Sequence, residues 1–395
     1  MKMESSACDI EPNRVAEAYR YHQPAFVPAQ IEKRLDFIDI NEDGLMLLGS
    51  SNLTGRIWNG SVWCFSHTEL EPKTDNSLTG VLCDSGVCDG LFLPSKDKIL
   101  IGKDSGVLQL LQLVEGSREW GGGGGNAGNA NGSDRLVESM PWEQADQKHH
   151  FMTLASAGEH DAAVLCLAVL PSSGSNSAFK AVSGGADMCI KIWDVEALVS
   201  EHTYRPAHSH QVVKVSAAPK GSNSEGLFAS CSLDGTALIW DPRQPRPAHL
   251  IFEAPGRCGA QALAWQPQSS AGVLAVGLGS GAVHLVDSRV GKKESTTTKL
   301  SVFQRSLHKL VFCPTRPQLL AACADDSVVK VIGLDGNCMN VEYTDDRHED
   351  FVRGLCWEPK ANSRLISCGW DHRIYAHVPP SSTLPSPPSS APIDD

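Results

Sequence analysis

Serine, histidine and aspartate, the residue types of a hydrolase triad, occur together in this sequence more than once. Two sets are completed by a tryptophan: His160, Ser183, Asp187 and Trp193; and His208, Ser230, Asp234 and Trp240. A third keeps His348, Ser367 and Asp371 but has His377 where the tryptophan belongs. A catalytic triad is built once per enzyme, around an exposed nucleophile and an oxyanion hole. Recurrence of the set at a fixed spacing therefore argues against catalysis.

Other signs of chemistry are missing from the sequence. It has no P-loop, no dinucleotide-binding glycine pattern after a strand, and no HExxH helix. Cys83 and Cys88 are the nearest cysteine pair in a loop, but no second pair matches them, which disfavours a zinc site. The sequence therefore predicts a protein that is not an enzyme, with no catalytic, metal-binding or cofactor-binding residues and no cofactor.

The elements that carry these residues repeat along the chain. The segments ending at Asp194 and Asp241 align without a gap, and weaker copies end at Asp287, Gly333 and Val378. The tight turn of each copy falls at Asp187, Asp234, Ser280, Asp326 and Asp371, in steps of 47, 46, 46 and 45 residues. This is close to the period of a four-stranded propeller blade.

Two further copies complete the count. One has its turn at Asp104, and the first copy runs from Arg34 to Ser66. The step from Asp104 to Asp187 is longer because a Gly/Asn-rich insertion at about 116–147 separates two strands; its composition predicts disorder. The copies resemble WD repeats, so the predicted fold is all-β: a seven-bladed WD-repeat β-propeller. The resemblance implies that each His–Ser–Asp–Trp set forms a buried chain of hydrogen bonds, in which the buried polar groups have partners.

The domain boundaries follow from this count. We expect an N-terminal tail at 1–30, the propeller at 31–380 and a disordered Ser/Pro tail at 381–395. Blade seven ends after its third strand, so the ring needs a closing strand from the N-terminus, for which residues Tyr19 to Val27 are the candidates. Pro24 and Pro28 are compatible with such a strand only at a sheet edge.

Charge and composition restrict the partners. The net charge is −12, which argues against direct nucleic-acid binding and suits cationic partners such as Arg-rich protein tails. No apolar window is long enough for a membrane span, so no membrane partner is expected. Most cysteines lie inside apolar strand-like runs, where they are interpreted as buried side chains in a reducing compartment.

Blade one departs from the repeat. Between its expected strands, Leu45 to Leu48 and Val62 to Phe65, the usual short turn is replaced by a longer segment that carries Arg56, Ile57 and Trp58. Trp and Arg are enriched in interface hot spots, so these three residues are the predicted partner-binding site. The alternative is that Trp58 folds back over blade one as a cap.

A second departure is the tetrapeptide Trp240-Asp241-Pro242-Arg243. A WDxR sequence at the end of a repeat resembles the box of substrate receptors of cullin-4 ubiquitin ligases. The alternative interpretation is an arginine that anchors the turn before Pro245.

Longer blocks carry a more specific resemblance. The sequences GRIWNGSVW around residues 55–63 and GWDH at 369–372 resemble the first and last blades of the WD-repeat subunit of the methylosome, and the similarity extends from about Arg34 to Pro380. The Gly/Asn-rich insertion is a departure from that family.

The resemblance implies a function. Such subunits bind the N-terminal barrel of the type II (symmetric) protein arginine methyltransferase in a four-plus-four hetero-octamer, with the segment matching Arg56 to Trp58 as a contact. They present Arg-rich substrates, namely Sm-protein and histone tails, and the expected location is cytoplasmic and nuclear. The alternative functions are a cullin-4 substrate receptor and a stand-alone histone-peptide reader.

Overall fold

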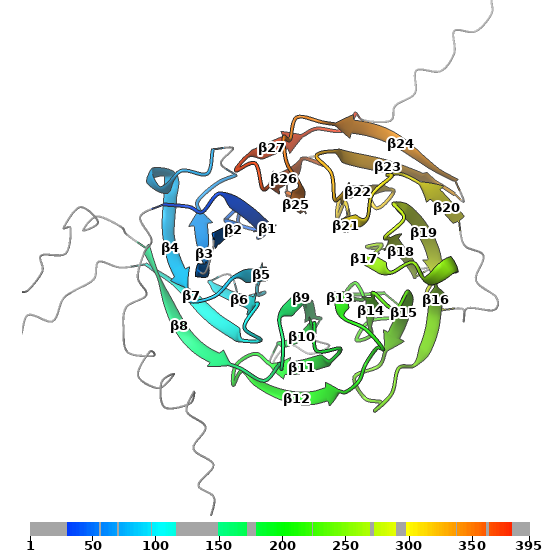
Figure 1. Ribbon diagram of the computed structural model, residues 1–395, viewed down its shortest axis with the longest axis horizontal. Helices are drawn as coiled ribbons and strands as arrows, with labels where there is room; N and C mark the ends of the chain where they lie inside the picture. The colour runs from blue at the N-terminus through cyan, green and yellow to red at the C-terminus, as the bar shows by residue number, and fades with distance from the viewer. Residues whose placement is uncertain are drawn as a thin grey trace, which may run out of the picture.

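The computed structural model of the protein describes residues 30–54, 57–68, 71–95, 97–115, 149–171, 179–222, 224–268, 272–289, 298–336, 338–360 and 363–380. These residues form seven antiparallel sheets arranged in a ring (Figure 1). Six of these sheets have four strands and the seventh has three. The protein is a seven-bladed β-propeller, and the predicted fold class is confirmed.

Each sheet is a meander of consecutive strands, with its first strand nearest the centre of the ring (Figure 1). Blade one contains β1 (Arg34–Ile40), β2 (Met46–Thr54), β3 (Ile57–Phe65) and β4 (Ser77–Cys83); blade two β5 (Val87–Phe92), β6 (Lys98–Lys103), β7 (Leu108–Glu115) and β8 (His149–Ala157). Blade three contains β9 (Val164–Leu170), β10 (Lys180–Gly185), β11 (Ile190–Asp194) and β12 (Val199–Tyr204); blade four β13 (Val212–Ala217), β14 (Phe228–Ser232), β15 (Thr236–Trp240) and β16 (His249–Glu253). Blade five contains β17 (Ala260–Trp265), β18 (Val273–Leu278), β19 (Ala282–Asp287) and β20 (Thr298–Ser301); blade six β21 (Leu307–Phe312), β22 (Leu319–Ala324), β23 (Val329–Asp335) and β24 (Cys338–Asp345). Blade seven contains β25 (Val352–Trp357), β26 (Leu365–Gly369) and β27 (Ile374–His377); two short 3-10 helices, η1 (Thr74–Asn76) and η3 (Pro255–Arg257), precede β4 and β17.

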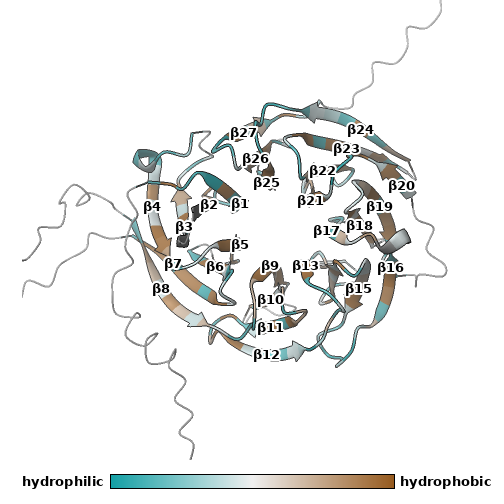
Figure 2. Ribbon diagram, in the orientation of Figure 1, coloured by the Kyte–Doolittle hydropathy of each residue, from teal (hydrophilic) through white to brown (hydrophobic). Residues whose placement is uncertain are grey.

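The second strand of each blade is almost completely buried. Every residue of β14, β22 and β26 is buried, and these strands are composed of small, branched or aromatic side chains and cysteine. Such strands pack between neighbouring blades, so they show continuous apolar runs rather than alternation. In Figure 2 the brown, apolar stretches lie on the strands, whereas the loops between strands are mostly teal. The cysteines predicted to be buried in these strands, such as Cys231 and Cys323, are indeed inaccessible.

The tight turn between the second and third strands needs a residue in the left-handed backbone conformation, with positive φ. Gly235 has φ of 86°, and a Cβ there would come within 2.8 Å of the carbonyl oxygen of Cys258 in the next blade. The same position is filled by Met188 in blade three and by His372 in blade seven, both with positive φ. Glycine is therefore required where the next blade comes close to this turn. At the equivalent turns of blades three and seven, a larger residue adopts the same left-handed conformation at a steric cost.

The ring closes where blades seven and one meet. One apolar cluster joins Leu35, Ile38 and Trp63 of blade one to Ile366 and Ile374 of blade seven. Blade seven has three strands in the described residues. The expected closing strand, Tyr19 to Val27, and the two predicted tails, 1–30 and 381–395, lie outside the described residues, apart from residue 30 itself.

The strands on either side of the Gly/Asn-rich insertion pair with each other. Glu115, the last residue of β7, is opposite His149, the first residue of β8. The insertion, 116–147, lies outside the described residues. Because its two ends belong to one hairpin, a short connection is able to replace it.

We therefore predict that deletion of residues 116–147, with a short Gly/Ser join, leaves the thermal unfolding midpoint nearly unchanged. Each doubling of loop length changes the closure free energy by only about 0.6 kcal/mol. The measurement is a melt followed by circular dichroism. A midpoint lowered by more than about ten degrees, which corresponds to several kcal/mol, would instead show that the insertion stabilises the fold.

Candidate functional site

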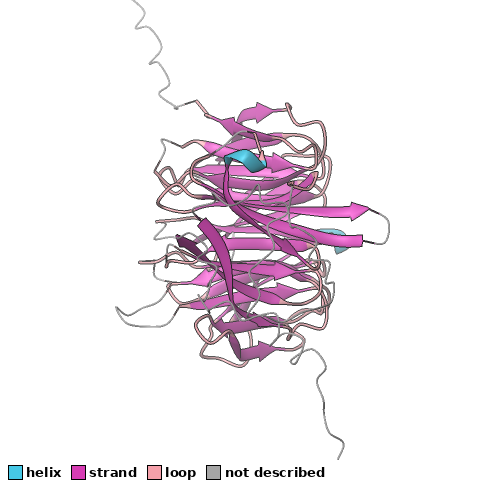
Figure 3. Cartoon of the chain, turned by 90° about the vertical axis from the view of Figure 1, so that its left-hand side faces the viewer, coloured by secondary structure: helices cyan, strands magenta, loops and turns pink. Residues whose placement is uncertain are grey.

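In every blade the second and third strands form a hairpin. Within the described part of the ring, the hairpin of blade one is the longest of these. Its strands β2 and β3 have nine residues each, and pairing continues from Met46 opposite Phe65 to Thr54 opposite Ile57. The neighbouring strands stop earlier, since β1 pairs only up to Ser51 and β4 only up to Gly60. The outer end of the hairpin extends past the rest of the disc in the edge-on view of Figure 3.

This corrects the expected loop between Leu48 and Val62. Ile57 and Trp58 lie in β3, and only residues 55–56 separate the two strands. Thr, Ile and Trp favour strands, and a two-residue connection that begins with Gly is typical of a hairpin turn, so the signal was present in the sequence. Arg56 lies outside the described residues, as do the side chains of Ile57 and Trp58.

The base of the hairpin is fixed by a buried polar group. Ser50 on β2 and Ser61 on β3 are both fully buried, with their hydroxyl oxygens 2.9 Å apart. The Glu32 carboxylate accepts hydrogen bonds from both hydroxyls, at 2.8 Å from Ser50, and the Trp63 indole donates to Ser61 at 2.7 Å. Glu32 was not predicted from the sequence, although it stands just before the inner strand, as the histidines of the repeat do.

In blades three and four the structure brings each predicted quartet together. His160 Nδ1 lies 2.9 Å from Asp187 and its Nε2 lies 2.7 Å from Ser183, which accepts a hydrogen bond from Trp193 at 2.8 Å. In blade four the corresponding distances are 3.2, 2.7 and 2.7 Å, between His208 and Asp234, His208 and Ser230, and Trp240 and Ser230. The two quartets lie in separate blades, so they form no common site.

Blade seven uses a second histidine in place of tryptophan. His348 bonds to both Asp371 and Ser367 at 2.8 Å, and Ser367 bonds to His377 Nε2 at 2.8 Å. Burial lowers the pKa of His377 to about 4. At neutral pH the imidazole is therefore uncharged, with one nitrogen able to accept and the other to donate; its Nε2 meets Ser367 and its Nδ1 lies 3.3 Å from the Asp345 carboxylate.

The serines of these sets are not nucleophiles that a substrate reaches. Ser183, Ser230 and Ser367 are fully buried, and in blades three and four each hydroxyl is held between an imidazole and an indole. Burial acts to raise the pKa of Asp187, but His160 and the backbone N–H groups of Cys189 and Asp161 together outweigh it and hold this pKa at about 2. The carboxylate stays ionised, and its role here is to orient the imidazole.

A second polar cluster lies beside the base of the hairpin, where β1 meets the turn before β27. Trp370, from the GWDH motif, donates its indole N–H to Asp36 at 2.9 Å. The guanidinium groups of Arg34 and Arg353 lie over its ring, 4.8 and 4.6 Å from the centroid. Burial raises the pKa of Asp36 to about 6. This cluster joins segments more than 300 residues apart and fixes blade seven against blade one.

The WDxR sequence has a local explanation. The Arg243 side chain donates from Nε and Nη2 to the two oxygens of Asp241, both at 2.8 Å. Arg289 makes the same bidentate contact with Asp287, and Arg347 makes it with Asp345. The Asp-x-Arg pairing thus recurs at three strand ends, as expected for an arginine that anchors a turn.

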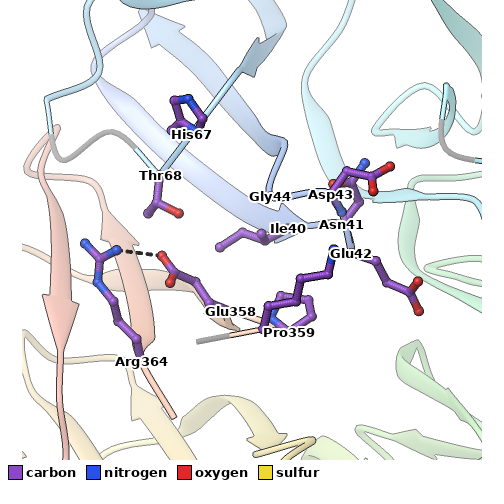
Figure 4. Close-up of a pocket in the computed structure, with 11 residues that line it drawn as sticks. Ile40, Asn41, Glu42, Asp43, Gly44, His67, Thr68, Glu358, Pro359 and Arg364 are labelled. Carbon is purple, nitrogen blue, oxygen red and sulfur yellow. Dashed lines mark hydrogen bonds and ion pairs between the residues drawn. The ribbon is translucent and has the colours of Figure 1, made fainter. Parts of the chain in front are cut away.

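At the end of blade one opposite the hairpin tip, a mixed-charge cavity separates blades one and seven (Figure 4). It has a volume of about 290 Å³ and is lined by residues of the β1–β2 turn, including Glu42, and by Lys360. Its Glu358 and Arg364 form an ion pair with each other at 2.8 Å. The paired charges make this cavity a weak candidate for a binding site.

Within the described ranges, no group of three or more His, Cys, Asp or Glu side chains is positioned to hold a metal ion. The same ranges contain no helix long and apolar enough to span a membrane.

Comparison with known proteins agrees with this geometry. Residues 152–194 and 199–241 match the family described as WD domain, G-beta repeat. Taken with the seven sheets and the His–Ser–Trp hydrogen bonds, this match defines the chain as a WD-repeat β-propeller.

Among individual proteins, the chain is similar to Methylosome protein WDR77 of Xenopus laevis, with 29% identity over 91% of this chain and 93% of that protein. The resemblance to a methylosome WD-repeat subunit is thereby confirmed. Protein valois of Drosophila melanogaster is 27% identical over 50% of this chain and 53% of its own length.

Two further likenesses are more limited. DDB1- and CUL4-associated factor 5 of Homo sapiens is 34% identical over 32% of this chain but only 12% of its own length. A chain in the crystal structure of the Mitotic Checkpoint Complex has a TM-score of 0.60 at 15% identity, with 90% of each chain covered, and shares the fold.

The quartets give a prediction about stability. Asp234 accepts hydrogen bonds from Ser209 and Thr236 as well as bonding to His208, so Asp234→Ala removes a charged partner from the buried His208 and from the part-buried Thr236. We expect a loss of about 2–4 kcal/mol in the free energy of unfolding.

Asp326→Ala is the matched control. Asp326 occupies the same turn position in blade six, where Ala322 and Ile332 replace the serine and tryptophan of the quartet, and it accepts a hydrogen bond from the backbone of Val328. Asp326→Ala should lower the free energy of unfolding clearly less than Asp234→Ala does. Chemical denaturation of both variants checks this, and equal losses would contradict the distinction between complete and degenerate blades.

Proposed function

We propose that this chain is the non-catalytic WD-repeat subunit of a methylosome. In this proposal it binds a type II protein arginine methyltransferase through the β2–β3 hairpin and holds Arg-rich substrates near the enzyme. The observation that carries the proposal is the hairpin itself, which extends past its neighbouring strands and has Ile57 and Trp58 on its outer part.

The outer part of the hairpin has the features of a docking element. Residues 52–54 and 57–59 pair with each other but not with β1 or β4, so each strand has a free edge. Backbone groups on such an edge, together with a Trp and an Arg, provide what a protein partner binds. The base, held by Glu32, Ser50 and Ser61, keeps the hairpin in a fixed direction, which lowers the entropy lost on binding.

The similarity to Methylosome protein WDR77 covers nearly the whole of both chains, and this supports a shared type of partner. The finer assignments belong to the same proposal: a four-plus-four assembly with the methyltransferase, Sm-protein and histone tails as substrates, and a location in cytoplasm and nucleus. A net charge of −12 favours the approach of Arg-rich tails, in a salt-dependent way.

A second candidate function is a substrate receptor of a cullin-4 ubiquitin ligase, favoured by the partial likeness to DDB1- and CUL4-associated factor 5. The Asp241–Arg243 pairing weighs against it, because the same pairing recurs at two other strand ends. Affinity purification from cell extract separates the two functions, since one predicts recovery of an arginine methyltransferase and the other recovery of a cullin adaptor.

Trp58→Ala tests the proposed interface. We expect the variant to remain folded and to lose about 2–4 kcal/mol of binding free energy, some thirty- to thousand-fold in Kd, as for a central tryptophan hot spot. Arg56→Ala should weaken binding by less if its side chain lies at the rim. The measurement is a calorimetric titration of each variant with the methyltransferase, alongside a thermal melt of the variant alone.

Met188→Ala is the control, because Met188 is an exposed apolar residue in the corresponding turn of blade three. It should bind as the unaltered protein does. If Trp58→Ala binds normally while its melting temperature falls sharply, Trp58 is a core residue and the interface lies on another surface.

A further inference from the structure

Trp370, in the turn before β27, is the centre of a cluster in which an aromatic ring binds cations. The guanidinium carbon of Arg34 lies 4.8 Å from the centroid of the indole, and that of Arg353 lies 4.6 Å from it. The indole is half-buried, and its Nε1 donates to the Asp36 carboxylate at 2.9 Å. A planar guanidinium group binds well to an aromatic ring that has a carboxylate beside it, through stacking and through charge.

The two arginines are held differently, and Arg353 is anchored by several groups. Its Nη1 forms an ion pair with Asp325 at 3.1 Å and lies 2.9 Å from Nδ1 of His308. Its guanidinium also lies over the ring of Phe351, 5.3 Å from the centroid, and its side chain is only 18% exposed. Arg353 is therefore a fixed part of the cluster.

Arg34 lacks such anchors. Among the described residues its half-buried side chain forms no hydrogen bond and no close ion pair, and Asp36 acts on it only through its charge. Arg347, by contrast, lies over the ring of Tyr375 at 4.7 Å and also makes the bidentate contact with Asp345. Of the stacked arginines in the described chain, Arg34 is thus the one that another cation displaces at the lowest cost.

The cluster lies beside the hairpin of blade one. Arg34 begins β1 and pairs with Ser51, the last residue of β2 that β1 covers. From there the hairpin continues without β1, and Asn52 is opposite Asn59. A guanidinium group bound to Trp370 therefore lies next to the element that, in the proposed function, docks the methyltransferase.

We propose that Trp370 and Asp36 form a binding site for an arginine side chain of an Arg-rich protein tail, and that Arg34 occupies this site while no tail is bound. The incoming guanidinium takes the place of Arg34 over the indole, whereas Arg353 stays where it is. The hydrogen bond from Trp370 to Asp36 is kept, so blades seven and one remain in contact during the exchange.

The class of ligand rests on the proposed function, in which Arg-rich tails are held near the methyltransferase. The net charge of −12 favours the approach of such tails. A lysine side chain suits the site less well, because its ammonium group is compact and strongly hydrated and does not stack as a plane.

The test titrates the full-length protein, without the methyltransferase, with the peptide Gly-Arg-Gly-Arg-Gly-Arg-Gly, and calorimetry gives the Kd. Arg34→Met removes the competing guanidinium and keeps an unbranched side chain. We expect Arg34→Met to bind the peptide at least about threefold more tightly than the unaltered protein, because the site is then always vacant.

Lys33→Met is the matched control, because Lys33 is exposed, adjacent to Arg34 and of the same charge. General electrostatic attraction predicts the same gain for both variants, whereas displacement predicts a clearly larger gain for Arg34→Met. A peptide with citrulline in place of arginine keeps the shape without the charge, and it should gain no affinity from Arg34→Met.

A second measurement places the peptide at the indole. In ¹⁹F NMR of protein labelled with 5-fluorotryptophan, the Trp370 signal, assigned with Trp370→Phe, should shift saturably as the arginine peptide is added. The affinity comparison needs no change at Trp370, so it holds even if Trp370→Phe does not fold.

Four results would overturn the proposal: no saturable binding of the arginine peptide to Arg34→Met, equal affinities of Arg34→Met and Lys33→Met, an equal gain for the citrulline peptide, or a Trp370 signal that stays unmoved at saturation. None of these measurements involves the methyltransferase or Trp58, so a failure here is distinct from a failure of the hairpin interface.

Discussion

Contact between the first and last blades is the interaction on which the rest of this structure depends. Each blade packs only against its neighbours, so a ring that fails to close leaves two apolar faces in water. Here closure combines the apolar cluster around Trp63 and Ile366 with the hydrogen bond from Trp370 to Asp36. The β2–β3 hairpin begins at this seam. Trp63 of β3 belongs to the closing cluster and also donates to Ser61, so ring closure and the base of the hairpin share a residue.

In four blades a buried serine of the second strand has hydrogen-bond partners on both sides of its hydroxyl. In blades three and four the partners are an imidazole and an indole. Blade seven replaces the indole with His377, and blade one brings in Glu32. The partners differ, but in each of these four blades the serine hydroxyl is paired, and this tolerance explains how the copies diverge while the blade persists.

The blades were predicted well from the sequence because their signal is local and periodic. A turn aspartate, a small-residue strand and a Trp-Asp ending recur within about twenty residues, and this pattern alone indicates Asp187 and Asp234 as turn residues. The hairpin was placed in the right blade but with the wrong form, since Ile57 and Trp58 are strand residues. There the departure from the repeat was taken for a loop, although the residues themselves favour strands.

Contacts between distant segments could not be predicted in the same way. Asp36 meets Trp370 across more than 300 residues, and nothing in the spacing of either residue indicates the other. Lys214 of blade four likewise pairs with Asp89 of blade two, and the two residues become neighbours only when the ring is formed. Such sites follow from the closed fold and from no single repeat.

The projecting hairpin of blade one is, in our proposal, where the partner binds. Amide hydrogen exchange of the protein, alone and saturated with the methyltransferase, tests this most directly, because residues 52–54 and 57–59 have edges that no neighbouring strand of their sheet protects. We expect exchange in peptides covering 50–61 to slow markedly in the complex, while that of the β1–β2 turn at the other end of the blade is unchanged. Unchanged exchange in the hairpin, with slowing confined to another surface of the ring, would contradict the proposed interface.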